Sequence, residues 1–247
     1  MISLLTAKGL VKSFGALRAS DGIDLEVGEG ETHAVIGPNG AGKTTFISQL
    51  AGSVRPDAGW IAFAGEDITR LSTASRARRG LARSFQITSV YLDFTALQNV
   101  ALAVLARSGR LGFWRDARSD PSLLQPAAEI LQEIGLAERA HVLAANLSHG
   151  EQRQLEVAMA LATRPRLLLL DEPMAGMGTE ESARMIALLT SLKQRHTIVL
   201  VEHDMDAVFR LADRISVLVY GRIIATDTPE RIRANEMVRK AYLGEDF

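Results

Sequence analysis

A glycine-rich segment, GPNGAGKT at residues 37–44, carries the residue types that bind phosphate groups in proteins. It follows the apolar run THAVI, and a helical pattern begins at Lys43. Glycines let backbone N–H groups wrap around phosphate oxygens, and the positive end of the next helix faces the same charge. The lysine would reach the β- and γ-phosphates, and the Thr44 hydroxyl would ligate Mg²⁺. The segment therefore predicts a nucleotide site formed by Gly37, Pro38, Asn39, Gly40, Ala41, Gly42, Lys43, Thr44 and Thr45.

Two acidic residues, Asp171 and Glu172, follow the apolar run LLLL. An acidic side chain at the end of a buried strand is costly unless it binds something, so we expect Asp171 to hold Mg²⁺, directly or through water. Glu172 lies at the carboxyl end of the strand, where α/β sheets bind ligands, and would act as general base on an attacking water. The alternative, that these residues merely end a strand, is weaker beside a phosphate loop.

The segment NLSHGEQRQLE at 146–156 is typical of a helix start, because Ser148 and Glu151 have the spacing of a capping box. A capped helix start with an adjacent glycine, here Gly150, is also suited to bind an anion. The two interpretations, a helix cap and a part of the phosphate site, are compatible.

Gln86 and His203 are weaker candidates when each is considered alone. A lone histidine at a strand end, such as His203 after IVLVE, is more often structural than catalytic, and Gln86 after ARSF carries less information still. Both gain a role only from the resemblance described below.

The bulk composition limits the class of protein. The chain has 247 residues, 47% of them apolar, a net charge of −1 and no cysteine. This length suits one large domain or two small ones, and the near-neutral charge argues against a general nucleic-acid binder. The absence of cysteine excludes disulfides and thiolate metal sites. We expect no signal peptide, and no run approaches the roughly 18–20 apolar residues that span a bilayer, so a soluble protein or a peripheral one is predicted.

The order of the elements predicts an α/β fold. Apolar runs and alternating patterns predict strands at 21–27, 32–37, 59–65, 81–86, 166–171, 197–202 and 214–219, with a last short strand after the YGR turn. Helical patterns begin at or near Lys43, Ser72, Thr95, Ser122, Ser148, Thr179, Met205 and Pro229. Strands alternating with helices imply a mostly parallel, helix-covered sheet. The middle, 94–163, shows no convincing strand and is a candidate helical subdomain.

The ordered set of the phosphate loop, SFQ, LSHGE, LLLLDE and VEHD resembles the ATP-binding subunit of an ATP-binding cassette (ABC) transporter over essentially the whole chain. The resemblance implies a P-loop NTPase core with a mostly parallel sheet, an N-terminal antiparallel β part and an inserted helical subdomain. The whole chain, 1–247, would be a single ABC ATPase domain. Its core would comprise 1–93 and 164–247, and its helical subdomain 94–163.

The resemblance also implies roles for single residues. Two such subunits pack head to tail, so Ser148 and Gly150 of one would contact the ATP that is held by the phosphate loop of the other. Phe14 matches the aromatic position that stacks on adenine. Gln86 would sense Mg²⁺ and water and couple the site to a membrane partner, and His203 would hold the γ-phosphate and position Glu172. Lys43 and these catalytic residues would act on ATP with Mg²⁺ as cofactor.

Three departures from the family pattern stand out. His149 and Glu151 replace the second glycine and the glutamine of an LSGGQ-type signature, and Glu151 would serve the helix cap more than the nucleotide. Gly178 stands where an aspartate is common, which puts the contact usually made there across the dimer in doubt.

A narrower resemblance, carried by LARSFQI, VEHDMDAV and the ending ERIRANEMVRKAYLGEDF, is to the branched-chain (hydrophobic) amino acid uptake group. It implies two membrane permeases, a second ABC ATPase subunit or a second copy of this chain, and a binding protein that selects the substrate. No nucleic acid is implied. The chain would lie at the cytoplasmic face of the plasma membrane, and 87–100 would form the docking groove unless it packs in the core. Alternatives are import of urea or short-chain amides, lipid-linked export, and a soluble ABC ATPase without transport.

Overall fold

The computed structural model describes residues 3–84, 90–108 and 120–243. Gln86, Trp114 and the first part of the expected docking groove, 87–89, lie outside the described residues. Within the described ranges, no helix combines the length and the apolar character needed to cross a bilayer.

A six-stranded sheet forms the centre of the molecule. Its strands lie in the order β10 (Arg222–Asp227), β9 (Arg214–Val219), β3 (Thr32–Ile36), β8 (Thr197–Val201), β7 (Leu167–Asp171) and β6 (Leu81–Arg83). The five strands from β9 to β6 are parallel, and only β10 runs antiparallel to its neighbour. Every residue of β3, β7 and β8 is buried, as expected for strands covered on both faces. The predicted mostly parallel sheet is confirmed.

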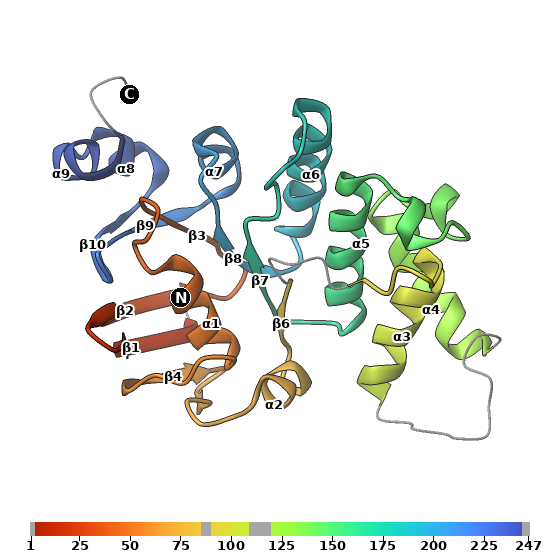
Figure 1. Ribbon diagram of the computed structural model, residues 1–247, viewed down its shortest axis with the longest axis horizontal. Coiled ribbons are helices and arrows are strands. Elements are labelled where there is room, and N and C mark those ends of the chain that lie inside the picture. The colour runs from red at the N-terminus through yellow and green to blue at the C-terminus, as the bar shows by residue number, and fades with distance from the viewer. Residues whose placement is uncertain (1–2, 85–89, 109–119, 244–247) are drawn as a thin grey trace.

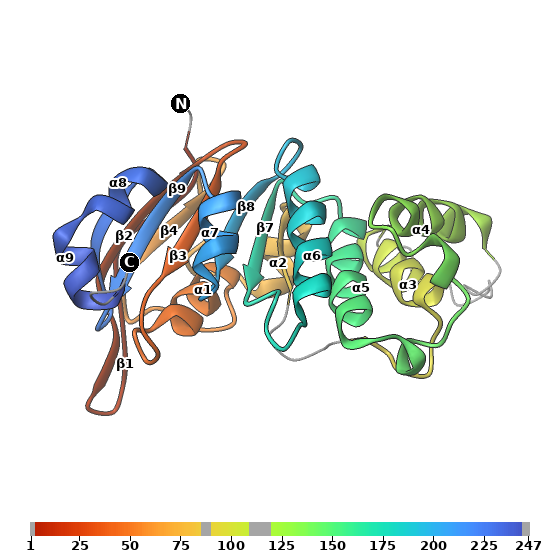
Figure 2. The same ribbon diagram turned by 90° about the horizontal axis from the view of Figure 1, so that it is seen from above.

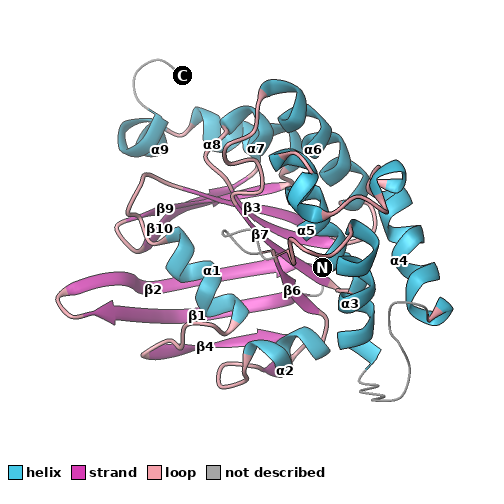
Figure 3. Ribbon diagram, turned by 45° about the vertical axis from the view of Figure 1, so that its right-hand side comes forward, coloured by secondary structure: helices cyan, strands magenta, loops and turns pink. Residues whose placement is uncertain are grey.

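A second, antiparallel sheet covers one face of the first. It contains β2 (Leu17–Gly28), β1 (Ser3–Phe14), β4 (Ala58–Phe63) and the short β5 (Glu66–Asp67), in that order. Helix α1 (Lys43–Ala51) lies between the two sheets, as Figure 3 shows. Its Phe46, Ile47 and Leu50 belong to one core cluster with apolar residues of both sheets. This burial fixes the direction of α1 and hence the position of the loop that precedes it.

Helices cover the opposite face of the parallel sheet. There α5 (His149–Ala162), α6 (Thr179–Leu192) and α7 (Met205–Leu211) share a core cluster with β7 and β8. Helices α8 (Pro229–Ala234) and α9 (Glu236–Val238) pack beside β9, followed by a π-helical turn at Arg239–Leu243. Helices α3 (Ala96–Ser108) and α4 (Pro121–Glu133) pack on α5 at the end of the molecule farthest from the β1–β2 hairpin (Figures 1 and 2). Short 3-10 turns, Ala137–Arg139 and Ala144–Asn146, lead into α5.

Most helix starts agree with the local sequence signals. Ser72 caps α2 (Thr73–Arg78), and Thr95 and Gln98 exchange hydrogen bonds at the start of α3. The helix expected to begin near Ser122 is confirmed, and α4 begins at Pro121. The carboxylate of Asp120 accepts from the Ser122 N–H and caps the helix, with proline at the first helical position. The strand expected at 81–86 is observed only at Leu81–Arg83, and its last two residues lie outside the described ranges.

Candidate nucleotide site

The sheet topology brings the sequence motifs to one edge. Strand β8 lies between β3 and β7, and all three run parallel. Val201 near the end of β8 pairs with Val35 of β3 on one side and with Asp171 of β7 on the other. The phosphate loop after β3, the carboxylates at the end of β7 and His203 after β8 therefore emerge side by side. The carboxyl edge of a parallel sheet is where α/β folds bind ligands.

The phosphate loop is held in a tight conformation by its own lysine. The Lys43 ammonium donates to the backbone carbonyls of Gly37 at 2.7 Å and Pro38 at 3.1 Å. Burial lowers the pKa of Lys43, while the nearby Asp171 and Glu172 oppose that shift. Gly42 has a left-handed φ of 104°, and a Cβ there would lie 2.1 Å from the carbonyl oxygen of Ala19, so only glycine fits.

The start of α1 is open to an anion. Gly42 is its N-cap and makes no side-chain capping hydrogen bond, so the first backbone N–H groups of α1 have no such partner. Asn39, Gly40 and Thr44 are exposed on the same loop, whereas Ala41 is buried and Pro38 and Thr45 are partly buried. The loop thus offers positive helix-end charge and free donors to a phosphate.

Asp171 is buried at the end of β7 and has a partner that the sequence interpretation missed. One carboxylate oxygen, Oδ2, accepts from the Arg83 guanidinium of β6 at 2.9 Å. The other oxygen, Oδ1, is buried without a hydrogen-bond partner. Burial raises the pKa of Asp171, and Arg83 counteracts this. In the sequence, Arg83 stands out only as a charged residue within the apolar run LARSF. Nothing in that run indicates that Asp171 is its partner.

Glu172 begins the loop after β7 in a strained backbone conformation. Its φ is 50°, in the left-handed region that glutamate rarely adopts. The Glu172 N–H donates to the Val201 carbonyl at 2.8 Å, and its own carbonyl accepts from the Ala175 N–H at 3.1 Å. Its side chain is partly exposed. Strain of this kind is often found at active sites, and here two hydrogen bonds maintain it.

Glu202, which the sequence interpretation passed over, links the two loops that carry Glu172 and His203. Its side chain is fully buried directly after β8. One oxygen accepts from the Met174 N–H at 3.0 Å, and the other accepts from the N–H groups of His203 at 2.9 Å and Asp204 at 3.4 Å. Burial raises the pKa of Glu202, while these backbone N–H groups oppose the shift. The side chain of His203 itself is exposed, and its Nδ1 lies 3.7 Å from Oε2 of Glu202.

We predict that Glu202→Gln lowers both stability and turnover. An amide keeps only one acceptor oxygen, so at least one buried N–H of these loops loses its partner, at a cost of about 1–3 kcal/mol. The displacement of Glu172 and His203 should lower ATP turnover about ten- to hundredfold. Thermal unfolding and phosphate release would measure the two effects. Glu26→Gln, at an exposed position paired with Lys8, is the control. A melting temperature and turnover equal to that control would contradict this role of Glu202.

Phe14 lies at the tip of the β1–β2 hairpin, with about half of its surface exposed. The Lys12 ammonium sits 5.4 Å from the centre of its ring. The Ala19 carbonyl of the same hairpin contacts the phosphate loop at Gly42, so the hairpin borders the loop. An exposed ring beside a phosphate site is available for stacking.

Ser148 and Gly150 do not join the phosphate loop of their own chain. They form the start of α5, where Ser148 and Glu151 make the predicted capping box. Glu151 accepts from the Ser148 N–H in this capping box and also pairs with Arg139. The Ser148 hydroxyl and the Gly150 N–H both donate to Glu181 in the first turn of α6, a contact that the sequence did not indicate. Gly178 is the N-cap of α6.

Comparison with known proteins places the chain in a family. A family model described as ABC transporter matches residues 20–175, which is more than half of the chain, and a model described as branched-chain amino acid ATP-binding cassette transporter matches residues 222–247. The chain belongs to the ATP-binding cassette family and is the ATPase subunit of an ABC transporter.

Two named relatives and one solved structure match this chain over nearly its whole length. The chain is 40% identical over 250 residues to the high-affinity branched-chain amino acid transport ATP-binding protein BraF of Pseudomonas aeruginosa, covering 98% of both chains. It is 34% identical to the lipopolysaccharide export system ATP-binding protein LptB of Haemophilus influenzae, covering 100% of this chain and 99% of LptB. The crystal structure of an ATP-binding cassette of an ABC transporter in its ADP conformation matches with a TM-score of 0.88 and 28% identity, covering 99% of this chain and 100% of that one.

Proposed function

We propose that this chain hydrolyses ATP with Glu172 as general base, in order to power the uptake of branched-chain or other hydrophobic amino acids. The observation that carries the catalytic part is the position of Glu172, which directly follows the buried Asp171 at the end of β7. Strand β7 is the second strand from β3, which leads into the phosphate loop. From there the Glu172 carboxylate takes a proton from the attacking water. Lys43 and the amides at the start of α1 bind the phosphates, and His203 contacts the γ-phosphate.

The remaining site residues complete the nucleotide site in this proposal. Phe14 stacks on the adenine through its exposed ring. The backbone from Gly37 to Thr45 surrounds the phosphates. Gln86 would help to hold Mg²⁺ and the attacking water, a role that follows from its place in the motif alone because it lies outside the described residues.

The donor set near the loop fits Mg²⁺. Asp171 holds a buried carboxylate oxygen without a hydrogen-bond partner, and the Thr44 hydroxyl is exposed on the adjacent loop. Among the described residues, no three His, Asp or Glu side chains gather into a metal site of their own. This suits Mg²⁺, which protein sites commonly hold through one or two carboxylates together with substrate phosphates. Mg²⁺ held by Asp171 and Thr44 would supply positive charge that neutralises the phosphate groups of bound ATP.

The working unit in this proposal is a head-to-tail dimer, formed with a second ABC ATPase subunit or with a second copy of this chain. Ser148 and Gly150 lie at the start of α5 and make their contacts away from their own phosphate loop. A helix start with a hydroxyl and a backbone amide that already bind a carboxylate suits the γ-phosphate of ATP held by the partner. ATP would thereby join the two subunits, and hydrolysis would release them.

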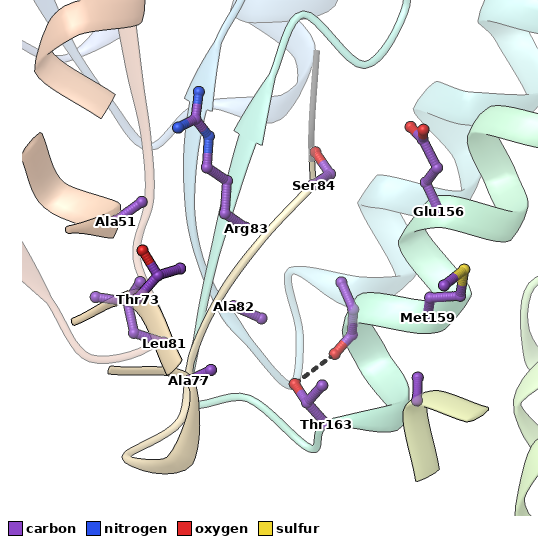
Figure 4. A pocket seen from close by; sticks show the side chains of 12 residues that line it. Ala51, Thr73, Ala77, Leu81, Ala82, Arg83, Ser84, Glu156, Met159 and Thr163 are labelled. Atoms are coloured by element: carbon purple, nitrogen blue, oxygen red, sulfur yellow. Dashed lines mark hydrogen bonds between the residues drawn. The ribbon is translucent and has the colours of Figure 1, made fainter. Parts of the chain in front are cut away.

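We assign the docking of the permease to a cavity between the core and the helical subdomain 94–163. The cavity, about 230 Å³ in volume, lies between β6 and α5, with Glu156 and Met159 on one wall (Figure 4). Ser84 lines the cavity and is two residues from Gln86 in the chain, so a permease segment seated there would act on the Gln86 segment. Its lining residues are Ala51, Thr73, Ala77, Leu81, Ala82, Arg83, Ser84, Ala103, Glu156, Met159, Ala160 and Thr163.

The segment expected as the docking groove, 87–100, contributes only in part to this surface. Val90 is buried in the core cluster around α3 and α5, so it packs as core. Tyr91 and Leu92 are about half exposed, and the ring of Phe94 lies tilted against that of Tyr91 with ring centres 5.4 Å apart. Tyr91 and Leu92 remain candidates for contact with the permease at the cytoplasmic face of the membrane.

The amino-acid substrate rests on the similarity to BraF over nearly the whole chain and on the match of residues 222–247 to the branched-chain model. The similarity to LptB makes lipid-linked export the second candidate. Import of urea or short-chain amides, and a soluble ATPase without permeases, are the remaining alternatives. In this proposal the permeases and a binding protein select the substrate. This chain itself need not contact the substrate.

The test is affinity purification of this chain from detergent-solubilised native membranes, followed by mass spectrometry of its partners. We expect two hydrophobic permeases and a second cassette subunit. The recovered complex, reconstituted in vesicles with its binding protein, should take up labelled leucine in an ATP-dependent manner, and labelled urea should remain outside. Recovery of no membrane protein, or of ribosomes or DNA-bound proteins, would overturn the transport proposal. Recovery of a lipid-extracting permease pair would favour the export alternative.

A further inference from the structure

The carboxylate of Glu181 lies between the starts of two helices. Its Oε1 accepts from the Ser148 hydroxyl at 3.0 Å and from the Gly150 N–H at 3.3 Å, both in the first turn of α5. The N–H of Gly178, the N-cap of its own helix α6, also donates to it. Helices α5 and α6 each have 14 residues, so both present a positive end to this one carboxylate.

Gly150 leaves the space in which this carboxylate sits. A Cβ at position 150 would lie 2.7 Å from both Cδ and Oε1 of Glu181. The glycine therefore allows a negatively charged group to approach the α5 amides closely, and in this chain that group is the carboxylate of Glu181.

The side chain of Glu181 is charged, and it can be displaced from the Ser148 and Gly150 donors. The hydrogen bond from Ser148 and those from the two backbone N–H groups lower the pKa of Glu181, so the carboxylate is ionised at neutral pH. The residue is only partly buried, and its side chain can swing toward solvent without opening the core. The charged carboxylate of Glu181 therefore occupies an anion site at the start of α5, and its side chain is only partly buried there.

We infer that Glu181 is a specificity-determining residue that makes the α5 anion site selective for a nucleoside triphosphate. In the free subunit its carboxylate occupies the Ser148 and Gly150 donors in cis. A γ-phosphate presented by the partner subunit carries more charge and more acceptor oxygens, and it displaces the carboxylate. ADP has no γ-phosphate to reach the site, so with ADP the donors stay engaged and the dimer stays open. This inference rests on the proposed head-to-tail dimer.

The test measures the ATP dependence of turnover in the purified transporter that contains its permeases and both cassette subunits. Glu181→Gln keeps the length and one acceptor oxygen of the side chain but removes the charge that competes with phosphate. We expect its KM for ATP to fall about three- to tenfold, while the inhibition constant of ADP stays unchanged. Glu180→Gln is the matched control. Glu180 is exposed on the same helical turn, and its substitution removes the same charge.

A second variant keeps the inference testable if the amide disturbs the fold. Glu181→Asp retains the charge but is one methylene shorter, so it should also release the donors and lower the KM for ATP. A KM equal to that of Glu180→Gln, a raised KM, or failure of both variants to assemble would overturn the inference and leave Glu181 a structural role. Ser148→Arg in the same complex tests the proposed dimer separately. If it leaves turnover intact, the cross-subunit assignment fails, whatever Glu181 does.

Discussion

Glu172→Gln is expected to lower the rate of ATP hydrolysis by about 10²- to 10⁴-fold, the usual contribution of a general base, while ATP binding stays intact. The substitution removes only the proton acceptor. Glutamine has the same length as glutamate, and its conformational strain at the left-handed φ of 50° is similar. The hydrogen bonds from the Glu172 N–H to the Val201 carbonyl and from the Ala175 N–H to the carbonyl of residue 172 should therefore persist. Lys43 and the amides of the loop, which bind the phosphates, are unchanged.

Two measurements on Glu172→Gln separate chemistry from binding. Phosphate release under saturating ATP gives the turnover, and calorimetry with ATP gives the affinity. Glu180→Gln, an exposed carboxylate eight residues along the chain, controls for the loss of one negative charge. Turnover close to that of the parent protein would refute Glu172 as the base. Loss of ATP binding together with turnover would instead mean that the loop had been displaced.

Ser148→Arg is expected to abolish ATP-driven association of the two cassette subunits while each subunit still binds nucleotide. The hydroxyl of Ser148 lies at the start of α5, at the surface that the proposal assigns to the partner's γ-phosphate. An arginine there fills that space with a long side chain. The phosphate loop of the same subunit is a separate element between β3 and α1, so its affinity for ATP should not change.

The capping role of Ser148 requires its own control. Ser148→Ala loses the cap hydrogen bond to the Glu151 N–H, which costs about 1 kcal/mol, but adds no bulk. Size-exclusion chromatography with light scattering, in the Glu172→Gln background and with ATP, would compare the variants alone and mixed with the second cassette subunit. Association in the alanine variant but not in the arginine variant supports the assignment. Dimers of Ser148→Arg on addition of ATP would show that α5 does not meet the partner's nucleotide.

The sequence alone determined the elements whose signals are local. The glycine and lysine spacing of 37–44, between an apolar run and a helical pattern, predicted the loop between β3 and α1. The spacing of Ser148 and Glu151 predicted the capping box of α5, because a cap is made within one turn of helix. Runs such as LLLLD predicted buried strands, since a parallel strand covered on both faces must be continuously apolar.

The tertiary structure alone decided which of these elements meet. Arg83 pairs with Asp171 across 88 residues, Ser148 contacts Glu181 across 33, and Glu202 supports Met174 across 28. None of these contacts follows from spacing, because each depends on the order of strands in the sheet and on how α5 and α6 pack over it. The sequence around a glutamate in the first turn of α6 is the same whether its carboxylate faces solvent or a neighbouring helix. Only the packing of α5 against α6 brings Glu181 to the donors of Ser148 and Gly150.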